Sequence, residues 1–313
     1  MIDVTQFQLS EQVGRYEGKV RDVYDLGDKM AMVATDRYSA FDRNLALIPH
    51  KGEVVTQMAK WWFDQTADIV PNHVISQPDP NVLLCKKLEV VPIEMVVRGF
   101  VSGVTNTSLW HTYSEGKREY GSFTLPDGLK KNDRLPEPVL TPTTKFEVHD
   151  RNLTPDEAVK EGLITTELWN QLQDAALKLF AFGQKTAETA GYMLVDTKYE
   201  FGLDSEWNLI LIDEIHTPDS SRFWDMSTYD ERRAAGQEPD NFDKEYLRLW
   251  YKERFDPYAE SAAPEVPQEQ IDELTRRYIK LYEDITGQTF TARSETTAQD
   301  DMKKNIEEPL ESA

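Results

Sequence analysis

Three charged side chains alternate along an apolar stretch and could carry out chemistry together. Asp196, Lys198 and Glu200 occupy every second position, and side chains alternate faces along a strand, so all three are expected on one face. After a turn at residues 202–205, an apolar run over residues 209–212 predicts a buried partner strand, directly followed by Asp213. A hairpin of this kind would bring Glu200 and Asp213 to the same end.

Carboxylates at such positions suggest a metal site. Glu200 and Asp213 supply hard oxygen ligands that suit Mg²⁺ with bound phosphates. The alternative is an ordinary solvated strand face on which Lys198 forms salt bridges with its neighbours. The pattern alone leaves both interpretations open.

Two further segments place cations beside glycine. Lys19 and Arg21 follow Gly18 and are expected on one face of the first strand of a hairpin, where they would lie over nucleotide phosphates. Arg98 follows an apolar pair and precedes a segment rich in Gly and hydroxyls, residues 99–108, which suits an anion pocket. The alternatives are exposed surface for the hairpin and a surface turn for Arg98.

Length and composition describe a globular protein with two expected subdomains. The chain has 313 residues, of which 39% are hydrophobic and 29% charged. No apolar run approaches the ~18 residues of a membrane helix, so no membrane association is expected. The start lacks a signal-peptide pattern and Cys85 is the single cysteine, which together predict a cytoplasmic protein.

The net charge restricts the class of partner. A formal charge of -21 would repel nucleic acid and anionic membranes, so neither is expected as a partner. A small phosphorylated ligand would need a local reversal of this field, which directs attention to individual Arg and Lys residues in clefts.

Helical patterns surround the charged hairpin. A helix over residues 166–190 leads directly into it, and Thr154, Pro155 and Glu157 predict a capped helix start upstream. Amphipathic helices are also predicted at residues 244–254 and 268–286. Residues 288–313 are polar with little to bury, which predicts a tail or a loosely docked end.

Six stretches together resemble the SAICAR synthetase family, in the family's order and over about two thirds of the chain. They are GKVRDVY at 18–24, TDRYSAFD at 35–42, VVRG at 96–99, LPEPVLTPTTK at 135–145, LVDTKYEFG at 194–202 and DEIHTPDSSRFW at 213–224. The chain is similar to the longer form of the family, which carries the Pro-Thr-Thr-Lys segment and a C-terminal helical extension.

The resemblance implies a fold and a reaction. The fold is α+β, with an antiparallel kinase-like N-terminal lobe at residues 1–95 and a larger ATP-grasp-related lobe with C-terminal helices at residues 96–313. The reaction is ATP- and Mg²⁺-dependent ligation of L-aspartate to the carboxylate of carboxyaminoimidazole ribonucleotide (CAIR), through an acyl phosphate, giving SAICAR, ADP and phosphate in purine biosynthesis. A monomer is expected, although the oligomeric state is left open.

The resemblance also implies roles for individual residues. Lys198 and Asp196 would be catalytic; Lys19, Arg21 and Lys198 would bind ATP; Ser39, Arg98, Ser102, Lys145 and Arg222 would bind substrate; Glu200 and Asp213 would bind the metal. Some members of the family carry Ser where this chain has Val104, so the hydroxyl that contacts the ribonucleotide phosphate is left open between Ser102, Thr105 and another group.

Two other classes of protein are alternatives to this family. A protein kinase would need His-Arg-Asp and Asp-Phe-Gly motifs, and neither string occurs. A nucleotide-binding protein without catalysis is not excluded by sequence, and turnover distinguishes it from a ligase.

Overall fold

The computed structural model describes residues 1–147, 151–257, 259, 261–294 and 296–311. The strands are β1 (Gly14–Glu17), β2 (Arg21–Asp25), β3 (Lys29–Ala34), β4 (Arg37–Ala40), β5 (Arg43–Leu47), β6 (Val74–Asp79), β7 (Val82–Lys86), β8 (Glu89–Val90), β9 (Ile93–Phe100), β10 (Arg134–Leu140), β11 (Thr143–Thr144), β12 (Tyr192–Leu203), β13 (Leu209–Ile212) and β14 (Ser221–Asp225). The helices are α1 (Lys51–Gln65), α2 (Leu109–Ser114), α3 (Pro155–Lys160), α4 (Thr166–Thr189), α5 (Tyr229–Ala234), α6 (Glu245–Lys252), α7 (Gln268–Thr286) and α8 (Ala298–Glu311).

The first part of the chain forms a small antiparallel sheet with strand order β1-β2-β3-β7-β6. Its inner strands β3 and β7 read as nearly continuous apolar runs because both of their faces are covered. Met32 and Leu83 belong to the main core that includes α1, whereas their neighbours Val33 and Leu84 pack in a second cluster with α8. This alternation follows from the two-residue repeat of a strand.

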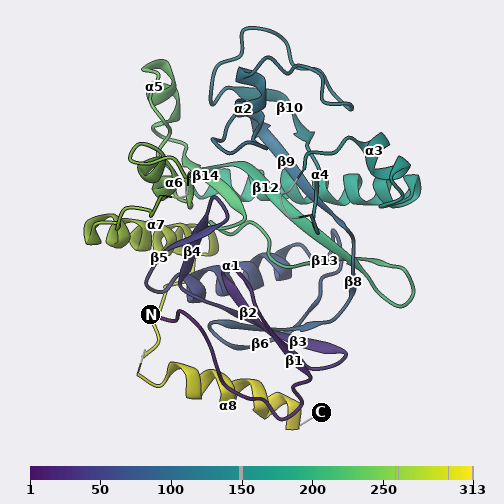
Figure 1. Cartoon of the computed structure of the whole chain (residues 1–313), viewed down its shortest axis with the longest axis vertical. Helices are drawn as coiled ribbons and strands as arrows, with labels where there is room; N and C mark the ends of the chain where they lie inside the picture. Colours follow the sequence, from purple (N-terminus) through teal and green to yellow (C-terminus); the bar gives the residue numbers. More distant parts are fainter. Residues whose placement is uncertain (148–150, 258, 260, 295, 312–313) are drawn as a thin grey trace.

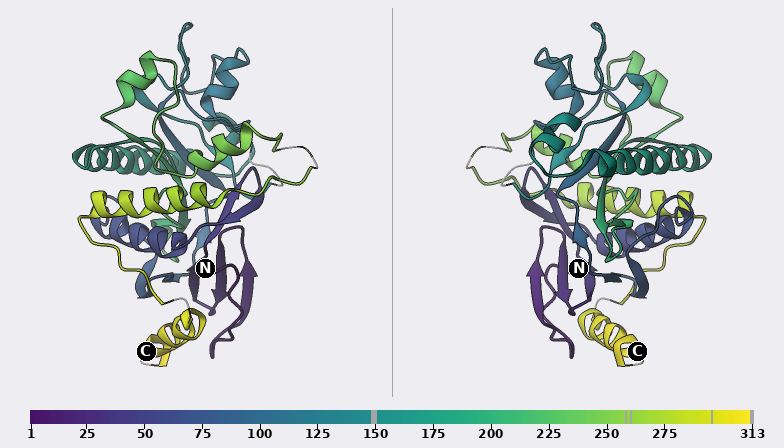
Figure 2. Two further views of the ribbon diagram at one scale, coloured as in Figure 1. Left: turned by 90° about the vertical axis from the view of Figure 1, so that its left-hand side faces the viewer. Right: turned by 90° about the vertical axis from the view of Figure 1, so that its right-hand side faces the viewer.

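The C-terminal segment differs from the expected loosely docked tail. Helix α8, which makes up most of the described part of this segment, lies along the small sheet on the side away from α1 (Figures 1 and 2). Its buried residues recur every fourth position, at Ala298, Met302, Ile306 and Leu310. The prediction of little to bury was wrong because this single apolar stripe is diluted by charged residues on the rest of the helix.

The larger sheet carries the charged hairpin. Its main strand order is β10-β9-β12-β13, with β11 paired to β9 and both β8 and β14 paired to β12. The predicted hairpin is confirmed, and Glu200 lies opposite Ile212, the residue before Asp213. Helix α4 packs against β12 and β9, and α7 packs against α1. The main core therefore runs from Trp62 of α1 to Leu179 of α4 without interruption.

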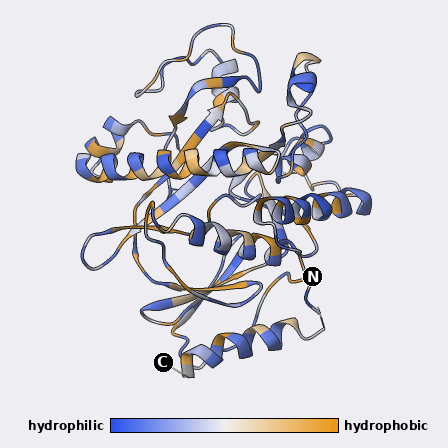
Figure 3. Ribbon diagram, turned by 180° about the vertical axis from the view of Figure 1, so that it is seen from behind, coloured by the Kyte–Doolittle hydropathy of each residue, from blue (hydrophilic) through white to orange (hydrophobic). Residues whose placement is uncertain are grey.

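Several local predictions are confirmed. Helix α4 begins at the predicted residue and α7 covers the predicted range. Thr154 and Glu157 form a complete capping box at the start of α3. The long helices carry both hydrophilic and hydrophobic residues (Figure 3), as expected for helices that cover a sheet with one face. Among the described residues, no helix is long and apolar enough to span a membrane. The division into lobes at residues 95 and 96 stays a prediction.

The docking of α8 yields a stability prediction. Met302→Ala should lower the free energy of unfolding by about 2–5 kcal/mol, because Met302 is fully buried against the small sheet and truncation leaves a cavity. Lys304→Ala on the same helix is the control, since this side chain is largely exposed. Urea titration measures both, and equal effects of the two variants would show that α8 contributes little to the folded core.

Candidate active site

A cleft of about 860 Å³ opens between the small sheet and the charged hairpin, with the β4–β5 hairpin and α6 at its sides. Its lining includes Lys19, Val20, Arg21, Ser39, Asp42, Glu94, Thr105, Lys198, Asp213, Glu214, Asp219, Ser220, Lys244 and Arg248. A smaller pocket of about 180 Å³ adjoins it, shares Lys198 and Asp219, and adds Arg98, Asp196 and Arg222. The combined space is of the size that binds small-molecule ligands. Another groove of about 580 Å³, beside His50 and α7, is lined by none of the predicted site residues.

Strand β12 supplies the centre of the cleft. Asp196 and Lys198 lie opposite Arg98 and Val96 of β9, and Glu200 lies opposite Ile212 of β13. The two-residue repeat places the three charged side chains on the face toward the cleft. The next residue, Tyr199, points the other way and is fully buried in the core.

Lys198 lies within a compact group of opposite charges. Its ammonium donates to Glu94 at 2.9 Å and also to Glu200, and Glu200 in turn accepts from Lys145. Burial favours the neutral acid, but the two lysines outweigh it and hold the pKa of Glu200 below its usual range. Burial likewise opposes the Lys198 charge, yet Glu200 and Glu94 raise its pKa. Lys198 and Glu200 are therefore both ionised at neutral pH.

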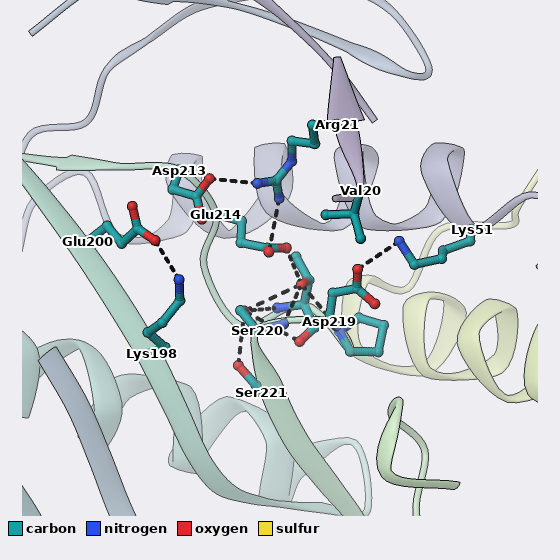
Figure 4. A network of polar contacts seen from close by, with 12 residues as sticks. Val20, Arg21, Lys51, Lys198, Glu200, Asp213, Glu214, Asp219, Ser220 and Ser221 are labelled. Carbon is teal, nitrogen blue, oxygen red and sulfur yellow. Dashed lines mark hydrogen bonds and ion pairs between the residues drawn. The ribbon is translucent and has the colours of Figure 1, made fainter. Parts of the chain in front are cut away.

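Arg21 joins the small sheet to the loop after β13 (Figure 4). Its guanidinium lies 2.5 Å from Asp213 and 3.0 Å from Glu214. Burial disfavours the charge, but these two carboxylates raise the pKa of Arg21, so it stays protonated. Asp213 has a left-handed φ of 67°, a conformation that Asp adopts more readily than most other non-glycine residues and that turns the chain after β13.

The loop between β13 and β14 is fixed at several points. Asp219 accepts from Tyr278 of α7 at 3.0 Å and forms an ion pair with Lys51 of α1 at 2.7 Å. Burial would raise the pKa of Asp219, but Lys51 and Lys244 lower it to about 2. Thr217 also donates its hydroxyl to Glu214 within the loop. The carboxylates that this loop presents to the cleft are thus held in place by contacts within the protein.

The adjoining pocket concentrates positive charge around one carboxylate. Arg222 donates to Asp196 at 2.6 Å, and Arg98 lies 3.5 Å from the same oxygen. Burial and the neighbouring Arg222 lower the pKa of Arg98 to about 10, while Asp196 opposes this. Within the described chain the buried Nε of Arg222 has no hydrogen-bond partner. Gly103 lets the chain approach closely, because a Cβ there would lie 3.0 Å from Arg222.

The structure brings most of the predicted site residues together. Ser39 lines the cleft on β4, Lys145 binds Glu200, and Ser102 donates to Asp196 at 3.5 Å. Lys19 departs from its expected place on a strand: β1 ends at Glu17 and β2 begins at Arg21, so Lys19 lies in the turn between them. There it is largely exposed and pairs with Asp42.

Two hydroxyl groups lie near the position of Val104, where some members of the family carry Ser. Val104 is buried, and Thr105 lines both the cleft and the adjoining pocket. Ser102 is buried beside Asp196. Both candidate hydroxyls therefore remain close to the Arg98 and Arg222 pocket.

Sequence reasoning missed several charged residues of the cleft. Five of them are Glu94, Glu214, Asp219, Lys244 and Arg248. Lys244 and Arg248 are four residues apart at the start of α6, a spacing that places them on one helix face. In so acidic a chain, two cations at this spacing were the sequence pattern that could have identified Lys244 and Arg248 as site residues. The remaining three are single carboxylates whose importance depends on which distant cations they meet.

Glu200 and Asp213 fit a weakly held metal. They lie at the same end of the β12–β13 hairpin, and each pairs with a cation of its own, Lys198 and Lys145 for Glu200 and Arg21 for Asp213. Among the described residues no group of three or more His, Cys, Asp or Glu forms a cage for a metal ion. Mg²⁺ usually takes one or two carboxylates and completes its shell with water and substrate phosphates, so two carboxylates suffice.

An α+β fold with a charged cleft between its two larger sheets, rich in both cations and carboxylates, defines an enzyme that handles phosphorylated small molecules. Comparison with known proteins identifies the family within this class of enzyme. The family model described as SAICAR synthetase matches residues 14–265. The chain is 55% identical over 276 residues to a phosphoribosylaminoimidazole-succinocarboxamide synthase of Legionella pneumophila (strain Paris), covering 88% of each.

Solved structures agree with this assignment. The fold matches SAICAR synthase from Saccharomyces cerevisiae complexed with SAICAR, with TM-score 0.78, 30% identity and coverage of 93% of this chain and 100% of that one. It also matches a SAICAR synthetase in complex with ADP, with TM-score 0.69, 27% identity and coverage of 89% and 100%. The chain belongs to the SAICAR synthetase family, and the fold expected from the resemblance is confirmed.

The cleft yields a prediction about proton uptake. Burial and the nearby Arg248 lower the pKa of Lys244 to about 8. A phosphate beside Lys244 favours its charged form, so ADP binding at pH 8 should take up about half a proton. Above that pH the free protein loses this charge and its affinity for ADP should fall. Calorimetry in buffers of different ionisation enthalpy measures the uptake.

Lys244→Gln should remove this proton uptake, and Lys252→Gln, at the exposed end of α6, should retain it. Equal uptake by wild type and Lys244→Gln would assign the titrating group elsewhere.

Proposed function

We propose that this chain joins L-aspartate to the carboxylate of CAIR at the expense of ATP, giving SAICAR, ADP and phosphate. The observation that carries the proposal is the continuity between the Arg98 and Arg222 pocket and the larger cleft around Lys198. One space suits a ribonucleotide phosphate and the other a nucleotide, so the carboxylate to be activated would lie near Lys198, where the two spaces meet. The relatives named for SAICAR synthesis, including one complexed with SAICAR and one with ADP, support this reaction.

In this proposal the cations divide between two phosphate sites. Lys19 and Arg21 lie over the ATP phosphates at the small sheet. Arg98 and Arg222 bind the ribonucleotide phosphate, because planar guanidinium groups suit bidentate recognition of phosphate. Ser39, Ser102 and Lys145 contact the substrates from the two sides of the cleft.

The chemistry requires two steps. A carboxylate oxygen of CAIR attacks the γ-phosphorus of ATP and ADP leaves; the amine of aspartate then attacks the acyl carbon, and phosphate departs with that oxygen. Lys198 stabilises negative charge as it moves between these oxygens. Asp196 holds both arginines of the phosphate pocket, so its part is to orient the ribonucleotide. The proton lost from the amine passes to one of the cleft carboxylates or to phosphate.

Mg²⁺ belongs to the proposal as the partner of ATP. Glu200 and Asp213 would hold it, and when bound it neutralises phosphate charge and orients the reacting phosphate. To reach the metal, Asp213 would release Arg21, which then becomes available to phosphate. A cytoplasmic location and a monomeric state remain predictions.

The reaction itself is tested by incubating the protein with MgATP, CAIR and L-aspartate and assaying ADP and SAICAR. Formation of both products in equal amounts, dependent on aspartate, is expected. Nucleotide binding without aspartate-dependent ADP release would favour a non-catalytic nucleotide-binding protein.

Arg98→Ala and Arg222→Ala should each weaken CAIR binding more than ATP binding. Charge-assisted hydrogen bonds contribute roughly 1.5–3 kcal/mol, so KM for CAIR should rise about tenfold to a hundredfold. Arg276→Ala, an exposed arginine on α7, is the matched control. Normal KM for CAIR with reduced ATP affinity would reverse the assignment of the two phosphate sites.

Asp213→Asn should remove the mutual dependence of Mg²⁺ and ATP binding. With metal bound, carboxylates that would repel the triphosphate become ligands, so metal and nucleotide should each raise the other's affinity by the same factor. Calorimetric titration of ATP with and without Mg²⁺ measures this coupling.

Glu206→Gln, at the exposed turn of the same hairpin, is the control for Asp213→Asn, and a thermal melt follows both variants. A lower melting temperature together with normal metal-coupled ATP binding would make Asp213 a structural partner of Arg21 and not a metal ligand.

A further inference from the structure

Arg37 is a buried arginine that contacts the turn between β1 and β2 from behind. It is 3% exposed and does not line the cleft. Its Nη2 donates to the carbonyl of Gly18 at 2.9 Å and its Nε to the carbonyl of Lys19 at 3.2 Å. The remaining Nη1 donates to the carbonyl of Asp3. The planar guanidinium thus holds two consecutive carbonyls of the turn.

The next carbonyl of the turn is held in the same way. The carbonyl of Val20 accepts from the backbone amide of Thr35 at 3.0 Å and from its hydroxyl at 2.9 Å. Three consecutive carbonyls, from Gly18 to Val20, are therefore fixed by groups at the end of β3 and the start of β4. Gly18 permits the tight turn, since a Cβ there would lie 2.9 Å from the carbonyl of Arg21.

Fixed carbonyls determine where the amides point. In a trans peptide the N–H lies opposite the C=O, so the amides of Lys19 and Val20 face away from Arg37. Within the described chain neither amide donates a hydrogen bond to another group. Both residues line the cleft. Consecutive free backbone N–H groups of this kind form a concavity that binds anions.

We propose that Arg37 is a positioning residue for the nucleotide: it holds the turn of residues 18–20 so that the amides of Lys19 and Val20 face the ATP phosphates. The inference rests on the proposed function, which places ATP in this cleft. Arginine is required because two nitrogens of one planar guanidinium donate to the carbonyls of Gly18 and Lys19 at the same time. The ammonium of a lysine is a single nitrogen at a different distance from the backbone and does not reproduce this pair of contacts.

Arg37 is itself rigidly held. It forms an ion pair of 2.8 Å with Asp22, which is fully buried and also accepts from the backbone amide of Thr5 at 2.6 Å. Contacts with the N-terminal segment therefore fix the orientation of Arg37, and Arg37 in turn fixes the conformation of the turn. Because its acceptors are already fixed, little conformational entropy is lost in holding this guanidinium in one orientation when a ligand binds.

The test compares Arg37→Lys with wild type and with Arg15→Lys. Arg15 also contacts Asp22, at 3.3 Å, but donates no hydrogen bond to the turn in the described chain, so it is the matched control. For Arg37→Lys, the Kd for ADP by calorimetry and KM for ATP should rise about tenfold, while KM for CAIR stays within about twofold. Hydrogen exchange of a peptide covering residues 16–24 should become faster in this variant alone.

Thr35→Val provides an independent variant if Arg37→Lys folds poorly. It removes one of the two hydrogen bonds to the Val20 carbonyl and should raise the Kd for ADP about threefold without affecting CAIR. Unchanged ADP affinity in a folded Arg37→Lys, or in Thr35→Val if that variant alone folds, would overturn the inference. An equal loss for all substrates would assign Arg37 a purely structural role.

The two proposals fail in different ways. If wild type bound no ADP, the proposed function would fail, and the exchange rate of the turn without ligand would still show whether Arg37 holds it. If wild type bound ADP but exchange at residues 16–24 were the same in Arg37→Lys, only the positioning role would fail.

Discussion

The ion pairs of Arg21 with Asp213 and Glu214 connect the two sheets across the cleft, and the arrangement of the site depends on them. Arg21 begins β2 of the small sheet, and the two carboxylates begin the loop after β13 of the larger one. Removing one partner of a buried pair leaves an uncompensated charge and typically costs about 3–5 kcal/mol. These ion pairs therefore tie the two walls of the cleft together, and a bound phosphate or metal would have to exchange partners with these groups.

The same pairing explains how an acidic protein can bind anions. With a net charge of -21, free cations in the cleft would be exceptional, and several of those described there form ion pairs with nearby carboxylates. Each of these paired cations is oriented by an acid that ligands can displace or share. Asp196 does this for Arg98 and Arg222, and Glu200 does it for Lys198 and Lys145. Binding then requires an exchange of ion pairs, with less reorganisation than an unstructured site would need.

Apolar packing supports these polar contacts from behind. Helix α1 carries Lys51 to Asp219 while its buried face joins both sheets, and α7 brings Tyr278 to the same carboxylate. On the far side of the small sheet, Arg293 leads into α8 and pairs with Asp79 at 2.6 Å. The inner strands β3 and β7 of the small sheet are consequently covered on both faces, which restricts the motion of this sheet relative to the hairpin.

The sequence alone determined features that depend on local geometry. The two-residue repeat placed Asp196, Lys198 and Glu200 on one face, and capping and periodicity located α3, α4 and α7, because neighbouring residues decide these features. Only the tertiary structure decided which charges meet: Arg21 and Asp213 are 192 positions apart. It also decided that α8 docks, since four apolar residues spaced by four become a buried stripe only against a sheet face left open for them. Long-range pairing depends on the packing of whole elements, which no local pattern specifies.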